Sequence, residues 1–109
     1  MDEQLKKGML DAFVLAFIKR NDTYGYLIVE KLSEHIEMSE STLYPILRRL
    51  CDNGFLSTYN LVHNGRTRKY YSITPSGENR LKIYKQDFNK LKVIFDTLMF
   101  RANKSKKKT

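Results

Sequence analysis

The chain has 109 residues, the length of one modest domain, and its formal net charge is +8 from twenty basic and twelve acidic side chains. Hydrophobic residues make up 41% of it and charged residues 29%, which excludes a disordered or collagen-like chain. A single cysteine excludes an internal disulfide framework and suits a reducing compartment. The longest unbroken apolar run, 12–18, is far shorter than the ~20 residues of a membrane span, and no secretory pattern opens the chain.

The basic excess is unevenly distributed along the chain. Residues 1–38 carry a net charge of −2, residues 39–74 carry +3, and residues 101–109 carry +5. We expect residues 104–109 to form a basic, disordered tail. The +3 of the central region is therefore the more informative part, and it indicates a polyanionic partner.

Apolar residues at helical spacing predict three helices in the first half of the chain, over residues 4–19, 24–36 and 39–53. Gly25 fits a close approach by another element. Ser39 is a typical N-cap for the third helix. Within that helix a stripe of four aliphatic residues is expected to be buried: Leu43, Ile46, Leu47 and Leu50.

The sequence period changes after the third helix. Residues 55–62 and 69–74 are rich in aromatic and β-branched side chains, and Asn64-Gly65 between them is a strong signal for a tight turn. We therefore predict a β-hairpin with Arg66 and Arg68 close to its tip. Its two neighbouring tyrosines, at positions 70 and 71, must point to opposite faces, one toward the core and one outward.

A helix is predicted from Pro75 to about Asn103, with Thr74 as its N-cap. At about 37 Å for roughly 25 residues, it is too long to bury itself against three short helices and a hairpin. We therefore predict a dimerisation helix; packing on its own domain is the alternative. Six apolar residues follow one another at spacings of 3, 4, 3, 4 and 3, the narrow seam of a pairing helix: Leu81, Tyr84, Phe88, Leu91, Phe95 and Leu98.

The predicted fold class is mainly α with a small β-hairpin. Residues 1–74 are expected to form a winged helix-turn-helix DNA-binding domain, residues 75–103 a C-terminal dimerisation helix, and residues 104–109 the tail. Short motifs mark the same elements: Tyr24-Gly25-Tyr26, the run Ser-Thr-Leu-Tyr-Pro-Ile-Leu-Arg-Arg-Leu at 41–50, Asn53-Gly54-Phe55-Leu56, the run Arg-Lys-Tyr-Tyr-Ser-Ile-Thr at 68–74, and Gly77.

Through these motifs the sequence resembles the PadR-type transcriptional regulators, in the compact form with a single C-terminal helix. The resemblance implies a cytoplasmic homodimer that binds palindromic operators in double-stranded DNA and represses transcription. It implies neither an enzyme nor a cofactor. It also explains Pro45, because a proline is usual at that place in the recognition helix of the family.

In compact members the C-terminal helices cross at the dimer centre beside the first helices, and some members hold a small aromatic or cationic effector there. This chain has no tryptophan, and Phe88 stands where some drug-binding relatives carry one. The resemblance places the seam for dimerisation and ligand at Met9 and Phe13 of the first helix together with five residues of the last: Tyr84, Phe88, Leu91, Phe95 and Leu98.

With the aliphatic stripe buried, six residues of the third helix are left for the major groove: Ser41, Thr42, Tyr44, Pro45, Arg48 and Arg49. Ser41 and Thr42, at the start of the helix, suit base edges or phosphates. The two arginines suit phosphates better, and guanine is the alternative. Three basic residues of the hairpin would hold the DNA backbone or the minor groove, the last with the weakest claim: Arg66, Arg68 and Lys69.

Two other functions remain open. One is a small-molecule-binding dimer that uses the aromatic seam and has little specific DNA binding. The other is a winged-helix protein that binds RNA or another protein. Catalysis and metal binding have no support, because no catalytic motif or metal-ligand spacing occurs. Cys51 is expected to pack against its neighbours, and His35 and His63 to lie at the surface.

Overall fold

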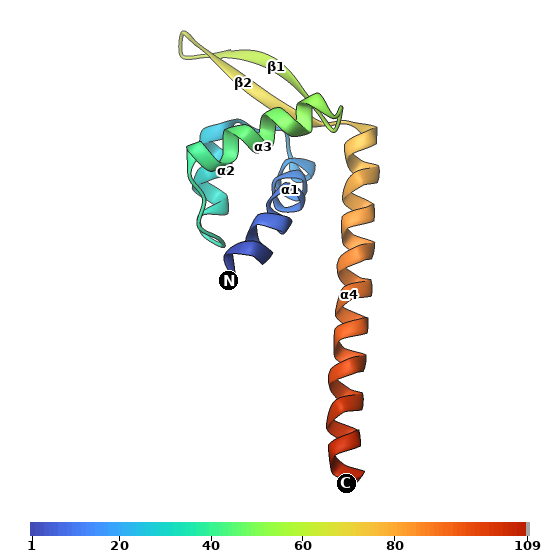
Figure 1. Ribbon diagram of the computed structural model, residues 1–109. Coiled ribbons are helices and arrows are strands. Elements are labelled where there is room, and N and C mark those ends of the chain that lie inside the picture. Colours follow the sequence, from blue (N-terminus) through green and yellow to red (C-terminus); the bar gives the residue numbers. More distant parts are fainter. Residues whose placement is uncertain (109) are drawn as a thin grey trace.

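The computed structural model describes the backbone of residues 1–108 and the side chains of residues 1–100. Three helices are followed by a hairpin and a long helix (Figure 1): α1 (Glu3–Arg20), α2 (Gly25–Leu32), α3 (Glu40–Asp52), β1 (Leu56–His63), β2 (Arg66–Ile73) and α4 (Pro75–Lys108). This order confirms the predicted fold class. The side chains of the expected tail, 104–109, lie outside the described residues, and its disorder stays a prediction.

One hydrophobic core joins the three short helices to the base of the hairpin. All four residues of the predicted α3 stripe are buried in it. Helix α1 contacts α2, α3, β2 and α4, so apolar residues on several of its sides are covered. Val14 and Leu15 of α1 are fully buried, although they are adjacent and point in different directions. The near-continuous apolar run of α1 follows from this central position.

Helix α2 is shorter than the predicted 24–36, because it ends at Leu32. The amide of His35 donates to the Leu32 carbonyl at 3.0 Å, which tightens the chain into a turn instead of another helical turn. The Ser33 hydroxyl donates to the Met38 carbonyl at 3.2 Å, and Met38 enters the core. This turn delivers Ser39 to the start of α3 as its N-cap.

Gly25, at the first turn of α2, lies against the side chain of Tyr44 from α3. A Cβ on Gly25 would lie 2.6 Å from the hydroxyl oxygen of Tyr44 on α3. A larger residue would therefore displace the Tyr44 ring from this position. The close approach expected at this position is confirmed.

The hairpin forms as predicted, with β1 and β2 antiparallel and His63 paired with Arg66 beside the turn. Asn64 and Gly65 both have positive φ, at 51° and 74°, which is the requirement of a two-residue primed turn. Tyr71 points into the core, and Tyr70 is half-buried on the opposite face.

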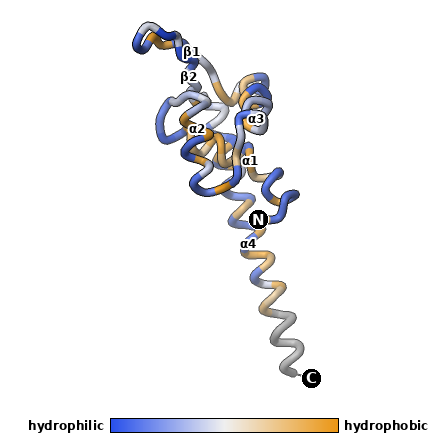
Figure 2. The backbone as a smooth tube through the Cα atoms, turned by 90° about the vertical axis from the view of Figure 1, so that its left-hand side faces the viewer, coloured by the Kyte–Doolittle hydropathy of each residue, from blue (hydrophilic) through white to orange (hydrophobic). Residues whose placement is uncertain are grey.

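Helix α4 begins where the sequence predicts. The Thr74 hydroxyl accepts from the Gly77 amide at 3.0 Å, and Pro75 occupies the first helical position. The three short helices and the hairpin together are called the winged unit below. Helix α4 runs away from this unit, and the longest dimension of the molecule is 72 Å (Figure 1). Apolar residues continue along it well beyond the point where it leaves the core (Figure 2). No helix within the described residues is long and apolar enough to cross a membrane.

Candidate nucleic-acid interface

The start of α3 carries a cluster of hydroxyl groups. The Ser39 hydroxyl accepts from the Thr42 amide at 3.3 Å, and it lies 3.0 Å from the Ser41 hydroxyl and 3.1 Å from that of Thr42. Ser41 and Thr42 are exposed. These two side chains are thus presented at the helix start, and each can exchange its hydrogen bond with Ser39 for a bond to a base or a phosphate.

Tyr44 and Pro45 lie next along the exposed face of α3. Tyr44 is 42% exposed and its phenol rests on Gly25, so α2 fixes the direction in which the hydroxyl points. Pro45 is exposed, and it lacks the amide hydrogen that the helix would otherwise use at this position. The face therefore presents a rigid, largely apolar centre between hydroxyls at one end and arginines at the other.

The two arginines near the end of α3 are in different situations. Arg49 donates from Nη2 to Asp11 Oδ1 at 2.5 Å and from Nε to Asp11 Oδ2 at 3.2 Å, a two-pronged ion pair with α1. The hydrogen bond and the negative charge of Asp11 raise the pKa of Arg49 above its ordinary value. Among the described residues Arg48 forms no ion pair, and its side chain is exposed. Sequence reasoning treated both arginines alike, because the Asp11 partner lies 38 residues away.

The basic residues of the hairpin do not share one face. Arg66 and Arg68 alternate with Tyr70 on one face of β2, whereas Lys69 lies on the other face with Tyr71. Arg66 is exposed beside the turn. The Arg68 guanidinium is half-buried and lies 4.1 Å from the centre of the Tyr24 ring. Because side chains alternate along a strand, the sequence alone could have separated Lys69 from the two arginines. The prediction grouped all three by their charge instead.

Residues 22–24, between α1 and α2, attach the hairpin to the helices, and we call them the wing anchor. The Tyr59 hydroxyl donates to Asp22 at 2.7 Å. The backbones of Thr23 and Tyr71 exchange two hydrogen bonds, at 2.7 and 3.1 Å. Tyr24 carries Arg68 on its ring. Both strands are therefore held by three consecutive residues, none of which the sequence analysis assigned to the hairpin.

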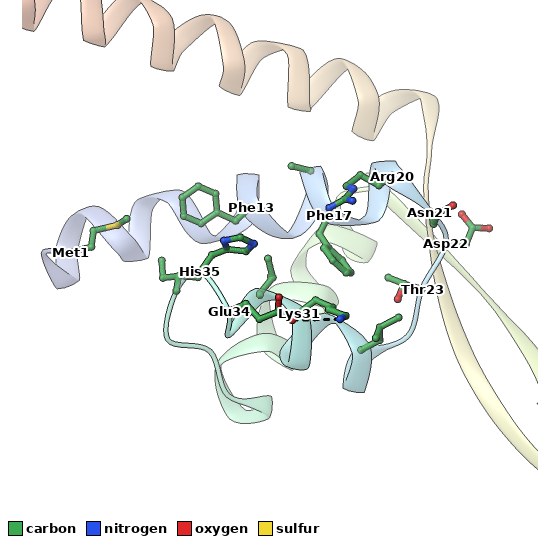
Figure 3. A pocket seen from close by; sticks show the side chains of 14 residues that line it. Met1, Phe13, Phe17, Arg20, Asn21, Asp22, Thr23, Lys31, Glu34 and His35 are labelled. Atoms are coloured by element: carbon green, nitrogen blue, oxygen red, sulfur yellow. Dashed lines mark ion pairs between the residues drawn. The ribbon is translucent and has the colours of Figure 1, made fainter.

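The seven residues of the predicted seam do not come together within one chain. Tyr84 and Phe88 are half-buried and stack at 6.4 Å on the part of α4 nearest the core. Leu91, Phe95 and Leu98 are 60% or more exposed. Met9 is half-buried on α1, and Phe13 lines a groove between α1 and α2 (Figure 3).

The apolar pattern of α4 is also broader than the predicted narrow seam. Five further large apolar residues are exposed on it: Ile83, Val93, Ile94, Met99 and Phe100. The predicted seam did not include them, because their positions do not follow its 3-4 spacing. Which of these residues pair in a dimer stays a prediction.

The remaining reactive side chains form no second site in the part of the chain that the structure describes. Cys51 is half-buried beside the core, and burial raises the pKa of its thiol. His35 and His63 are exposed. No group of three histidine, cysteine, aspartate or glutamate residues is placed to hold a metal ion within the described residues.

Two helices joined by a turn, α2 and α3, with a third helix beneath them and a basic hairpin beside them define a winged helix-turn-helix protein. The comparison with known families places the chain within this class. The model of the transcriptional regulator PadR-like family matches residues 14–83, well over half of the chain. The protein belongs to the PadR-like family of transcriptional regulators, for which DNA binding is implied, and it is not an enzyme.

Solved structures and a curated relative agree with this assignment. A PadR-like regulator of Bacillus cereus superposes with a TM-score of 0.81 at 30% identity, covering 89% of this chain and 97% of that one. The protein smu.1704 of Streptococcus mutans gives 0.77 at 38% identity over 85% and 88%. The transcriptional regulator Rv3488 of Mycobacterium tuberculosis is 32% identical over 72% of this chain and 74% of its own.

Proposed function

We propose that the protein is a homodimeric repressor that binds palindromic operator DNA in the cytoplasm. The observation that carries this proposal is the exposed face of α3, which presents Ser41 and Thr42 at its start and, near its end, Arg48, which forms no ion pair with any described residue. Because the aliphatic stripe fixes the opposite face of α3 in the core, these side chains point away from the protein. The width of a major groove admits such a helix.

The side chains divide by the kind of contact they suit. Ser41 and Thr42 lie at the helix start, where base edges are reached, and we assign them the reading of sequence. Arg48 and Arg66 are exposed cations, and we assign them phosphates. Arg68 serves first to hold the hairpin on Tyr24, with one side of its guanidinium left for the DNA backbone. Tyr44 adds a hydroxyl directed by α2, and Lys69, on the far face of the hairpin, contributes least.

Arg49 is the exception within the predicted set. Its guanidinium is held by both carboxylate oxygens of Asp11. Contact with DNA would have to compete with that ion pair. We therefore assign Arg49 to fixing α3 on α1 and only Arg48 to the phosphates.

The dimer is supported by the apolar residues that α4 exposes beyond Phe88. Two copies paired through α4 present two α3 helices, as a palindromic operator requires. The same central region, which contains Tyr84, Phe88 and Phe95, is the place where a flat aromatic or cationic effector would stack. A dimer that only captures such a compound is the second candidate function, and the exposure of this aromatic surface is what favours it.

The test is a binding titration with DNA from upstream of the protein's own gene, at several salt concentrations. Arg48→Ala is expected to weaken binding on every sequence and to reduce the magnitude of the salt slope by about 2, one phosphate in each protomer. Arg49→Ala is the matched control, with a much smaller change in slope. Thr42→Val is expected to alter which operator bases are preferred.

Two results would contradict the proposal. Equal affinity for the upstream segment and for scrambled DNA at moderate salt would exclude specific repression. Equal salt slopes for the Arg48 and Arg49 variants would remove the assignment of Arg48 to phosphate.

A further inference from the structure

A groove of about 770 Å³ lies between α1 and α2, and Figure 3 shows α4 on the other side of α1. Its volume is within the range of about 300–1,000 Å³ that small-molecule sites occupy. The lining contains no residue of α3 or α4, and it shares Phe13 with the predicted seam. Its lining is mainly apolar: Phe13, Ala16, Phe17, Leu27, Leu32 and Ile36.

One end of this groove holds a buried hydroxyl that lacks a hydrogen-bond partner. Thr23 is only 3% exposed, and its Oγ1 bonds to no other group among the described residues. Figure 3 shows its side chain extending from the connection between α1 and α2 toward the groove. Since buried polar groups are nearly always hydrogen-bonded, this hydroxyl indicates a polar group of a ligand at that position.

Arg20 and Asp22 bring one positive and one negative charge to the same end of the groove. Arg20 lines the groove and forms no ion pair among the described residues. Lys31 lies 3.5 Å from Glu34, and Asp22 keeps its negative charge while it accepts the Tyr59 hydroxyl. Arg20 is therefore the cation of this lining that is left without an ion pair among the described residues. Arg20 can only donate hydrogen bonds, and the Thr23 hydroxyl can donate one. Together they suit an anionic acceptor.

We propose that the groove binds an elongated apolar carboxylic acid, with its carboxylate at Thr23 and Arg20 and its chain along Phe17 and Phe13. The distance along α1 from Phe13 to Arg20 is about 10 Å, the rise of seven helical residues. An acid of about ten carbons fits this length. Its carboxylate satisfies the Thr23 hydroxyl, and its chain covers the apolar lining.

This site is directly connected to the hairpin. Thr23 and Asp22 line the groove, and they are also two of the three residues of the wing anchor. A ligand that draws the Thr23 side chain toward the groove acts on the backbone bonds between Thr23 and Tyr71. The consequence for DNA, which rests on the proposed function, is that the acid changes operator affinity by reorienting the hairpin.

Binding is tested first, without DNA, by calorimetric titration of the full chain with decanoate. Decanoate is expected to bind at least tenfold more tightly than decanol, which has the same chain length without the charge. Thr23→Val keeps the shape of the side chain and is expected to weaken decanoate binding about tenfold, the loss of one hydrogen bond to a charged group. Lys19→Gln is the matched control, because Lys19 pairs with Glu78 of α4 and does not line the groove.

A second variant distinguishes a ligand from a second copy of the chain as the occupant. Ala16 is exposed and lines the groove, so Ala16→Glu fills the groove without removing a core side chain. It is expected to abolish decanoate binding and to leave the oligomeric state unchanged in light scattering. Loss of the dimer would show that the groove receives part of another protomer, and would overturn the proposal.

Two further outcomes also test the proposal. Equal binding of decanoate to the original chain and to Thr23→Val would overturn the assignment of the carboxylate to Thr23. Decanoate binding that leaves operator affinity unchanged would overturn the connection through the wing anchor and leave the site standing. Because operator affinity is also measured without decanoate, failure of the repressor function appears separately.

Discussion

The apolar side chains of the winged unit are largely buried, whereas those of the far part of α4 are exposed. Every buried hydrophobic side chain among the described residues lies between Leu10 and Tyr71, in the three short helices, the connection before α3 and the base of the hairpin. By contrast, residues 91–100 of α4, which we call the distal segment, expose seven large apolar side chains: Leu91, Val93, Ile94, Phe95, Leu98, Met99 and Phe100.

This contrast shows which part of the molecule is complete within one chain. The apolar residues of the distal segment surround most of the helix, and a helix that is apolar nearly all round is normally buried. Their exposed area is on the order of 700 Å² per chain, close to the about 800 Å² that each partner buries in a standard interface. We expect the winged unit to fold alone and the distal segment to be covered by a second copy in the proposed dimer.

The largest expected effect comes from placing charge on the distal segment. The double substitution Phe95→Glu with Leu98→Glu is expected to convert the proposed dimer into a folded monomer, because two carboxylates per chain would be buried without partners. Light scattering after size-exclusion chromatography gives the mass, and circular dichroism checks the winged unit. Operator affinity should fall at least a hundredfold, since two half-sites are no longer bound together.

Lys92→Gln is the control for this substitution. It lies in the same segment and removes only the 2.8 Å ion pair with Asp96, an exposed pair that contributes little to stability. A double variant that kept the dimer mass would show that the distal segment is not the interface.

The second prediction measures how unequal the two regions are in stability. In the monomeric background, Leu47→Ala is expected to lower the free energy of unfolding by about 2–5 kcal/mol, because Leu47 is 1% exposed in the core. Leu91→Ala in the same background should change it by less than about 0.5 kcal/mol. Urea denaturation gives both values, and similar losses for the two would contradict the division of the molecule into a complete unit and an incomplete one.

The sequence predicts those parts of the fold that depend on local rules. The α3 stripe, the Ser39 and Thr74 caps and the Asn64-Gly65 turn each follow from a few neighbouring residues, and the structure confirms them. The end of α2 was missed, because the turn after Leu32 is stabilised by Met38 entering the core. That contact depends on the packed tertiary structure.

The candidate site divides in the same way. The exposed face of α3 could be predicted, because it is the complement of the buried stripe. The pairing of Arg49 with Asp11 and the wing anchor could not be predicted, since both join residues far apart in the sequence. The α1–α2 groove likewise arises only from the packing of two helices.

A smaller effect is expected from the ion pair that ties α3 to α1 inside the winged unit. Both partners are partly exposed, so solvent weakens the interaction. Asp11→Asn is expected to lower the free energy of unfolding by about 0.5–1 kcal/mol. A double-mutant cycle with Arg49→Gln measures the coupling in urea denaturation. A coupling near zero would mean that the pair does not fix α3, and Arg49 would return to the set of residues available for DNA.

The smallest effect tests how closely the winged unit excludes water around Cys51. Burial raises the pKa of this thiol, and the nearby Lys69 opposes the shift. The folded protein therefore holds a smaller fraction of reactive thiolate at pH 8 than the unfolded chain, and its reaction with a disulfide reagent should be several-fold slower than in urea. Because the folded pKa is the higher one, the associated stability is present below the unfolded pKa of about 8.5 and is lost as the pH rises through the folded value. Lys69→Gln should slow the reaction further, whereas Lys92→Gln on the distal segment should not. A folded-state rate equal to that in urea would mean that this edge of the unit is as open to water as the distal segment.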